Sequence, residues 1–102
     1  SRETQAIAEK AGVTLRAVSV GDAGTRWGSC SSSGRIRYSW RLILAPPEVR
    51  RYLVAHEVAH LVHMNHGADF KVLEQQLFGG PVVPVGRVLT RIGPRLRRIG
   101  RR

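Results

Sequence analysis

Two histidines and a glutamate in the middle of the chain have the spacing of a metal site with a base beside it. His56, Glu57 and His60 form the pattern H-E-x-x-H within the stretch 46–67. On a helix, residues four apart share a face about one turn apart, so both imidazoles can bind one metal ion. The glutamate between them lies where it can take a proton from metal-bound water. The pattern therefore predicts a hydrolytic metal centre with Glu57 as its catalytic residue.

A third ligand has to come from outside this pair. His66 follows the turn at 65–67, where the chain can fold back over the metal, and we expect it to be that ligand. His63 shares the helix face, but it lies about 7.5 Å along the axis from the midpoint of the pair, which bonds of about 2 Å do not readily span. A carboxylate, Asp69 or Glu74, and His63 itself are the alternatives.

This ligand set favours Zn²⁺, with one ion per chain. Three protein ligands leave a fourth position open, as a hydrolytic zinc site requires. Imidazole nitrogens in a tetrahedral arrangement suit zinc, and nickel, cobalt and manganese are the other divalent ions considered for these donors. We therefore expect His56, His60 and His66 to hold zinc.

A long helix has to carry the first two histidines. Two prolines and Glu48 form a helix start, because proline loses no hydrogen bond at the first helical position and the acid complements the positive end of the helix dipole. Residues 49–64 contain neither glycine nor proline, and their apolar side chains are spread around more than one face. Such a helix is expected to be central, packed on a sheet and on neighbouring helices.

Short strands precede this central helix. Apolar residues fall at alternate positions over 13–20 and 35–40, and an extended stretch at 25–30 leads into a Ser-Ser-Ser-Gly hairpin loop. Three flanking helices and one short extended piece complete the expected elements, at 4–11, 68–78, 85–92 and 42–45 respectively. The sequence thus predicts an α+β fold in which a small antiparallel sheet of about three strands packs on the H-E-x-x-H helix.

Composition describes one globular domain. The chain has 102 residues, of which 42% are hydrophobic and 24% are charged, and it contains no apolar run of the length that a membrane span needs. Cys30 is the single cysteine, so no internal disulfide can form and a cytoplasmic location is expected. Because the chain does not begin with methionine, we expect it to be the C-terminal part of a longer protein.

Positive charge is concentrated at the end of the chain. The net charge is +10, and seven arginines but no acid follow Gly86. We expect a metallohydrolase domain over 1–85 and an arginine-rich, partly disordered tail over 86–102. Such a tail is either a solvated, mobile end or a contact for nucleic acid, an acidic partner or anionic lipid.

Three arginines near the hairpin are candidates for substrate binding. Arg26, Arg37 and Arg41 could hold a carboxylate or phosphate group bidentately beside the metal. The alternative is that they line the solvent face of the hairpin. Trp27 is expected in the core, and Cys30 is expected to be a small buried residue rather than a metal cap of a latent form.

These motifs together resemble the YgjP-like metallopeptidase family. The resemblance extends over about residues 13–78 and rests on Thr-Arg-Trp-Gly-Ser-Cys-Ser-Ser at 25–32, on the blocks at 34–37 and 40–47, and on the histidine motifs. It implies a minimal zincin fold with SprT-like relatives. It also implies that three histidines, His56, His60 and His66, bind the metal and that Glu57 is the catalytic acid and base.

Three functions are compatible with these features. The leading one is a zinc-dependent hydrolase, by motif a metallopeptidase acting on peptides. The second is a metal-dependent nucleoside triphosphate pyrophosphohydrolase that uses the arginines to bind a nucleotide. The third is a nucleic-acid-associated zinc-binding module anchored by the basic tail.

Overall fold

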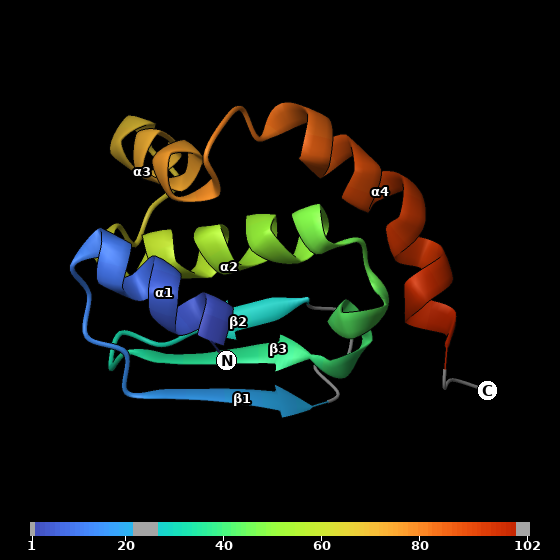
Figure 1. Ribbon diagram of the computed structural model, residues 1–102, viewed down its shortest axis with the longest axis horizontal. Coiled ribbons are helices and arrows are strands. Elements are labelled where there is room, and N and C mark those ends of the chain that lie inside the picture. The colour runs from blue at the N-terminus through green and yellow to red at the C-terminus, as the bar shows by residue number, and fades with distance from the viewer. Residues whose placement is uncertain (1, 22–26, 100–102) are drawn as a thin grey trace.

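The computed structural model describes residues 2–21 and 27–99, and within them a three-stranded sheet lies under a layer of helices (Figure 1). The predicted α+β class is confirmed. In chain order the elements are α1 (Arg2–Ala11), β1 (Ala17–Gly21), β2 (Gly28–Cys30), β3 (Arg35–Ser39), the 3₁₀ turn η1 (Trp40–Leu44), α2 (Pro47–Val62), α3 (Ala68–Phe78) and α4 (Val83–Arg98).

The sheet is mixed rather than antiparallel. Its strand order is β1-β3-β2, with β2 antiparallel and β1 parallel to β3. The predicted hairpin of β2 and β3 is therefore confirmed, whereas an all-antiparallel sheet is wrong. The reason is that β1 does not pair with β2, which follows it, but with the other side of β3. Since β2 runs opposite to both of its chain neighbours, β1 and β3 must run in the same direction.

One face of β3 is buried and the other is open. Ile36 and Tyr38 are 1% and 5% exposed, whereas Arg35 and Arg37 point outward. After β3 the chain does not stay extended, as predicted for 42–45, but forms η1. The Ser39 hydroxyl accepts a hydrogen bond from the backbone N–H of Arg41, which caps this turn.

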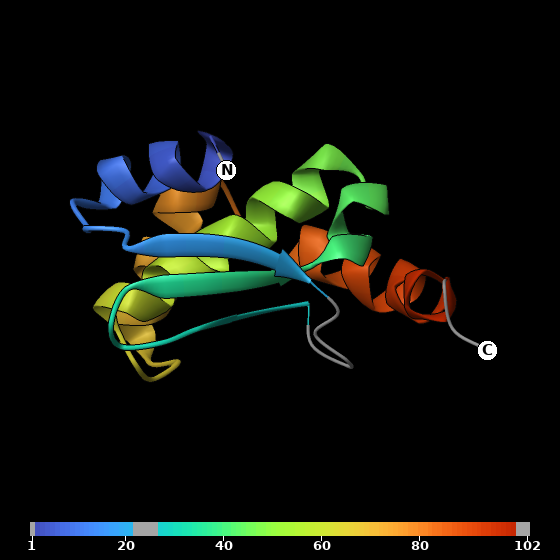
Figure 2. The same cartoon turned by 90° about the horizontal axis from the view of Figure 1, so that it is seen from below.

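The central helix is α2, as the sequence predicts. Its buried residues lie around much of its circumference, and α1, α3, α4 and the sheet all contact it. Figure 2 shows the same stack from below, with the sheet in front of the helices. Two left-handed glycines end the flanking helices, Gly12 after α1 and Gly79 after α3. These helices thus begin and end close to their expected positions.

The last helix is longer than expected. Instead of a short helix over 85–92, α4 extends over sixteen residues and includes Pro94. An apolar side holds it in place, because Val85 is buried and Val88, Leu89, Ile92 and Leu96 pack against the core. Residues 86–98 are therefore helical. The division of the chain at residue 85 falls inside α4 and stays a prediction.

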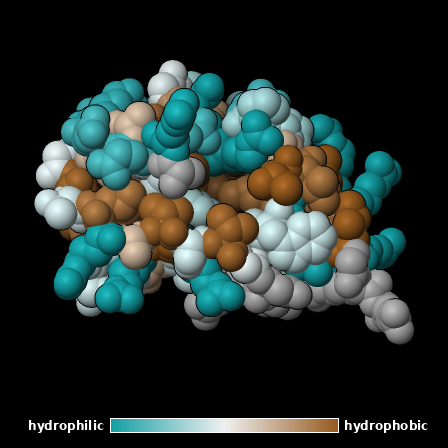
Figure 3. Space-filling view, turned by 60° about the horizontal axis from the view of Figure 1, so that its bottom comes forward, coloured by the Kyte–Doolittle hydropathy of each residue, from teal (hydrophilic) through white to brown (hydrophobic). Residues whose placement is uncertain are grey.

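The surface combines a hydrophobic band with charged margins. Figure 3 shows this band across one face of the molecule. Among the exposed hydrophobic residues are Val20 (61% exposed), Ile43 (67%) and Leu44 (46%). None of the helices in residues 2–21 and 27–99 combines the length and the hydropathy that crossing a bilayer requires.

Candidate metal centre

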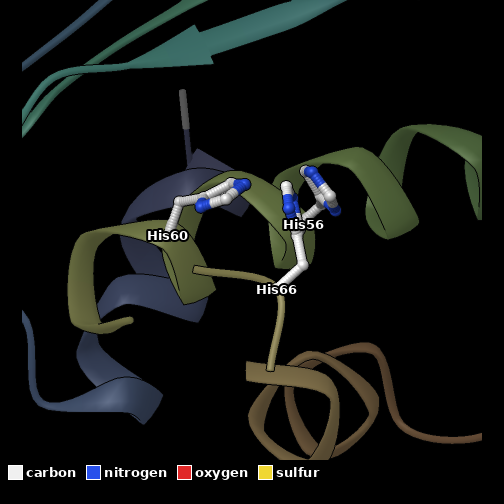
Figure 4. Close-up of side chains that lie close together, drawn as sticks. All are labelled: His56, His60 and His66. Atoms are coloured by element: carbon white, nitrogen blue, oxygen red, sulfur yellow. The ribbon is translucent and has the colours of Figure 1, made fainter. Parts of the chain in front are cut away.

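The three predicted histidines converge. His56 and His60 come from α2, and His66 comes from the segment that leads into α3 (Figure 4). Their ligand atoms all lie within 4.8 Å of one another. The chain turns back after α2 because the Asn65 side-chain oxygen accepts a hydrogen bond from the backbone N–H of Gly67 at 3.0 Å. This local turn brings His66 over the helix.

The spacing of these rings suits a small cation. Their centroids lie 4.8 Å apart for His56 and His60, and 4.4 Å apart for His60 and His66. In a tetrahedral site with Zn–N bonds of about 2 Å, the nitrogens lie roughly 3.3 Å apart. The ligand nitrogens of the three histidines lie within 4.8 Å of one another, so modest side-chain rotations would bring them to that spacing around a zinc-sized ion.

Phe70 of α3 lies against all three histidines. Its ring centroid is 5.2 Å from that of His56, 4.6 Å from that of His60 and 4.9 Å from that of His66. The phenyl ring is only 2% exposed, so it forms an apolar support that restricts how the imidazoles can turn. The sequence indicates only that Phe70 belongs to the apolar side of its helix.

Glu74 lies behind His56. Its Oε2 is 2.6 Å from His56 Nδ1, and the glutamate is 5% exposed. A carboxylate at this distance accepts the Nδ1–H hydrogen bond, which leaves Nε2 of the same ring free to bind a metal. From the sequence, Glu74 is a candidate for the third ligand. The structure gives it a different contact, one that fixes the orientation of a histidine.

Glu57 lines the same cavity as the histidines and is 5% exposed. A Cβ at Gly28 would lie 3.1 Å from Glu57 Oε2, so the absence of a side chain at this position lets β2 approach the carboxylate closely. Cys30 of the same strand is half-buried. Burial first, and then the charge of Glu57 and a hydrogen bond to it, raise the pKa of the Cys30 thiol to about 11. Cys30 therefore stays protonated at neutral pH.

Burial also affects His60. It lowers the pKa of His60, and the neighbouring imidazoles of His56 and His66 lower this pKa further. A lower pKa favours the neutral imidazole, which is the form that binds metals.

A cavity of about 420 Å³ opens onto these groups. Strand β2 forms one wall of it and α2 the other. Its lining residues are Gly28, Ser29, Cys30, His56, Glu57, His60, Met64 and His66.

Neither Arg37 nor Arg41, two of the predicted substrate arginines, lines this cavity. Arg41 is 2% exposed, its Nε donates a hydrogen bond of 2.9 Å to the Ile99 carbonyl, and its guanidinium lies over the Trp40 ring. Arg37 is exposed on the open face of the sheet and lines a neighbouring groove, which also includes Ser29 and Cys30. Arg26 lies outside the described residues.

Neither His63 nor Asp69, which the sequence also admits as a third ligand, belongs to the cluster of three histidines. His63 is the C-cap of α2, where its backbone N–H donates to the Ala59 carbonyl, and Asp69 is exposed in the first turn of α3. Within the described part of the chain, only His56, His60 and His66 form a cluster with metal-ligand spacing.

Trp27 is a core residue, as expected, and it connects the site to α4. It is 8% exposed and directly precedes β2. A Cβ at Gly93 of α4 would lie 3.5 Å from its ring, and the Arg97 guanidinium lies 5.2 Å from the ring centroid. The indole thus packs between the wall of the cavity and the last helix.

Comparisons with known proteins agree with this geometry. The family described as "YgjP-like, metallopeptidase domain" matches residues 1–81. The crystal structure of the metallopeptidase zymogen of Pyrococcus abyssi abylysin has the same fold, with a TM-score of 0.77 and 18% identity over 90% of this chain and 93% of that one. A search of curated proteins found no match. Family and fold support a metallopeptidase-type hydrolase, and the chain belongs to the YgjP-like metallopeptidase family.

Proposed function

We propose that the protein is a zinc-dependent metallopeptidase in which His56, His60 and His66 hold the metal and Glu57 acts as the general base. The observation that carries this proposal is the convergence of three imidazoles beside a buried glutamate in one cavity. A bound zinc ion would supply a Lewis acid that polarises a carbonyl group and acidifies water.

The residues of the chain supply the remaining steps. Glu57 accepts the proton of the attacking water and passes it to the leaving amine. Because Gly28 has no side chain, the carboxylate of Glu57 has room beside strand β2. Glu74 holds His56 in the tautomer that exposes Nε2. Phe70 keeps water away from the back of the rings, because it is buried against all three of them.

A peptide is favoured over a nucleotide as the substrate. Strand β2 lies at the edge of the sheet and lines the cavity, so its unpaired backbone groups can hydrogen-bond an extended peptide. A triphosphate would instead need the predicted arginines. Arg41 is buried against Trp40 and Ile99, and Arg37 lines a neighbouring groove, which favours the peptide. The experiment described next therefore also includes nucleoside triphosphates as alternative substrates.

The test uses the zinc-loaded protein, a panel of peptides and a panel of nucleoside triphosphates. Glu57→Gln should retain about one zinc ion per chain and lower the peptide turnover by roughly 100-fold or more, because general base catalysis is lost. Glu48→Gln is the matched control, since Glu48 is an exposed acid in the first turn of the same helix. It should leave turnover unchanged.

Two results would reject the proposal. Undiminished peptide turnover in Glu57→Gln would remove Glu57 from its role. The wild-type protein could instead hydrolyse a nucleoside triphosphate but no peptide, and Glu57→Gln could abolish that activity. Glu57 would then still be the general base, but the substrate would be a nucleotide. Metal content, measured on every variant, separates a loss of chemistry from a loss of zinc.

A further inference from the structure

Four arginines of α4 form a row on its outer side. Arg87, Arg91, Arg95 and Arg98 are all exposed, and their spacing of four, four and three residues keeps them within an arc of about 80°. At 1.5 Å per residue the row is roughly 16 Å long. We call these four residues the arginine row.

The opposite side of α4 is packed on the body of the protein. Val85 is buried, and Val88, Leu89, Ile92 and Leu96 contact the core. The helix also contacts α2 and η1. Figures 1 and 2 both show α4 along the rim of the molecule, beside η1 and the end of the sheet. The fold therefore fixes the row toward solvent and prevents α4 from turning its apolar side outward.

The helix that carries the row contains no acid to neutralise it. Between Glu74 and residue 102 there is no acidic residue, so neither α4 nor residues 99–102 contain one. Like charges at i and i+4 on a helix destabilise it by a few tenths of a kcal/mol per pair. An anionic partner with several regularly spaced charges would relieve that repulsion and would gain from all four guanidinium groups.

We propose that the arginine row binds the phosphate backbone of nucleic acid without reading its sequence. Guanidinium groups bind phosphate bidentately, and a row of them held on a packed helix can contact successive phosphates of one polymer. An anionic membrane is the less suitable partner, because an interfacial helix inserts its apolar face and the apolar face of α4 is already covered.

This surface is separate from the candidate metal centre. None of the four arginines lines the histidine cavity, and α4 lies beyond residues 1–81, the part that matches the metallopeptidase family. The binding therefore needs neither zinc nor catalysis, and it can be measured whether or not the proposed peptidase activity exists.

The size of the effect follows from the number of phosphate contacts. On duplex DNA each neutralised phosphate adds about −0.9 to the slope of log K against log salt concentration. Four contacts would give a slope of about −3.6, which weakens binding roughly 100-fold between 50 and 200 mM salt.

The experiment measures fluorescence anisotropy of a labelled 20-base-pair DNA duplex of arbitrary sequence over this range of salt. The row variant replaces the four arginines of the row by glutamine, which keeps helix propensity. The matched control replaces four other exposed basic residues by glutamine, namely Arg2, Arg16, Arg35 and Lys71. Both variants lose four positive charges, so that they differ only in where the charges lie.

We expect the row variant to bind at least tenfold more weakly at 100 mM salt and its slope to become shallower by about 3 to 4. The control should keep most of the wild-type slope. A third variant with lysine at the four row positions should also keep it, because the slope counts positive charges. If the fourfold glutamine variant does not fold, single arginine-to-glutamine replacements at the row positions carry the test, and each should make the slope shallower by about 0.9. Far-UV circular dichroism checks the fold of each variant.

Three outcomes would overturn the proposal. The row variant could bind with the wild-type slope, which would show that the row makes no phosphate contacts. Both glutamine variants could lose affinity equally, in which case net charge alone is responsible. Finally, the protein could bind phosphatidylserine vesicles but not the duplex, which would identify a membrane as the partner instead.

Discussion

His63 and His66 are three residues apart, but their surroundings differ sharply. His63 ends α2 as its C-cap, whereas His66 follows the turn made by Asn65 and joins His56 and His60 within 4.8 Å. Helix geometry is enough to distinguish these two histidines, because only a residue beyond the last turn of α2 can fold back toward His56 and His60. The sequence could therefore predict which of them reaches the pair.

Replacing each of these histidines by alanine gives a matched comparison. His66→Ala should lower zinc affinity by more than roughly 100-fold, since it would remove a proposed ligand rather than an outer hydrogen-bond partner. His63→Ala should change zinc affinity little. Competition with a chromophoric chelator measures both. If His63→Ala lowered zinc affinity more than His66→Ala did, His63 rather than His66 would be the third ligand.

Glu74 offers a second test among single side chains. Glu74→Gln keeps the shape of the side chain but removes the charge that holds His56 Nδ1–H, so zinc affinity should fall by about 10–100-fold. Asp69→Asn is the control, because Asp69 is an exposed acid of the same helix. The same chelator competition applies. Equal affinities of Glu74→Gln and the wild type would exclude the orienting role.

Among the helices and strands, η1 and α4 are joined by a buried arginine. Arg41 of η1 donates to the carbonyl of Ile99, which is the C-cap of α4. Trp27 forms a second junction between α4 and β2. The last helix is thus attached to the rest of the molecule at two points besides its apolar side. This attachment accounts for an ordered helix where the spacing of glycine and proline predicts a short helix and a tail.

Arg41→Gln should weaken the attachment. Removing a charged donor from a buried site costs about 2 kcal/mol, and urea unfolding should show this loss in the free energy of unfolding. Arg37→Gln is the control, because Arg37 is exposed on the sheet and should leave stability within about 0.5 kcal/mol. If Arg41→Gln kept full stability and instead raised KM, Arg41 would return to the substrate-binding residues.

For the molecule as a whole, local sequence signals predict the helices and the hairpin, but they do not predict contacts between distant parts of the chain. The central helix, the β2–β3 hairpin and the ends of α1 and α3 follow from periodicity, capping and turn residues within short windows. The parallel pairing of β1 with β3 depends on contacts between residues far apart in the chain, and no short stretch of sequence contains both partners. The contact of Glu74 with His56 likewise depends on how α3 packs on α2.

The arginines illustrate the same limit. Composition indicates that positive charge gathers at the end of the chain, but not that four of these arginines lie in one row on a packed helix. Composition also does not separate Arg37, which is exposed, from Arg41, which is buried only four residues later. Burial is decided by the tertiary fold, and here η1 turns Arg41 inward.

The strand order also bears on how the chain folds. Cys30 pairs with Ile36, six positions further along, whereas Ala17 pairs with Arg35, eighteen positions further along. The entropy lost on closing a loop rises with its length, so the hairpin can form first and offer β1 a ready edge. Strand β2, which forms a wall of the histidine cavity, belongs to that early hairpin. The chain would then build this wall before the sheet is complete.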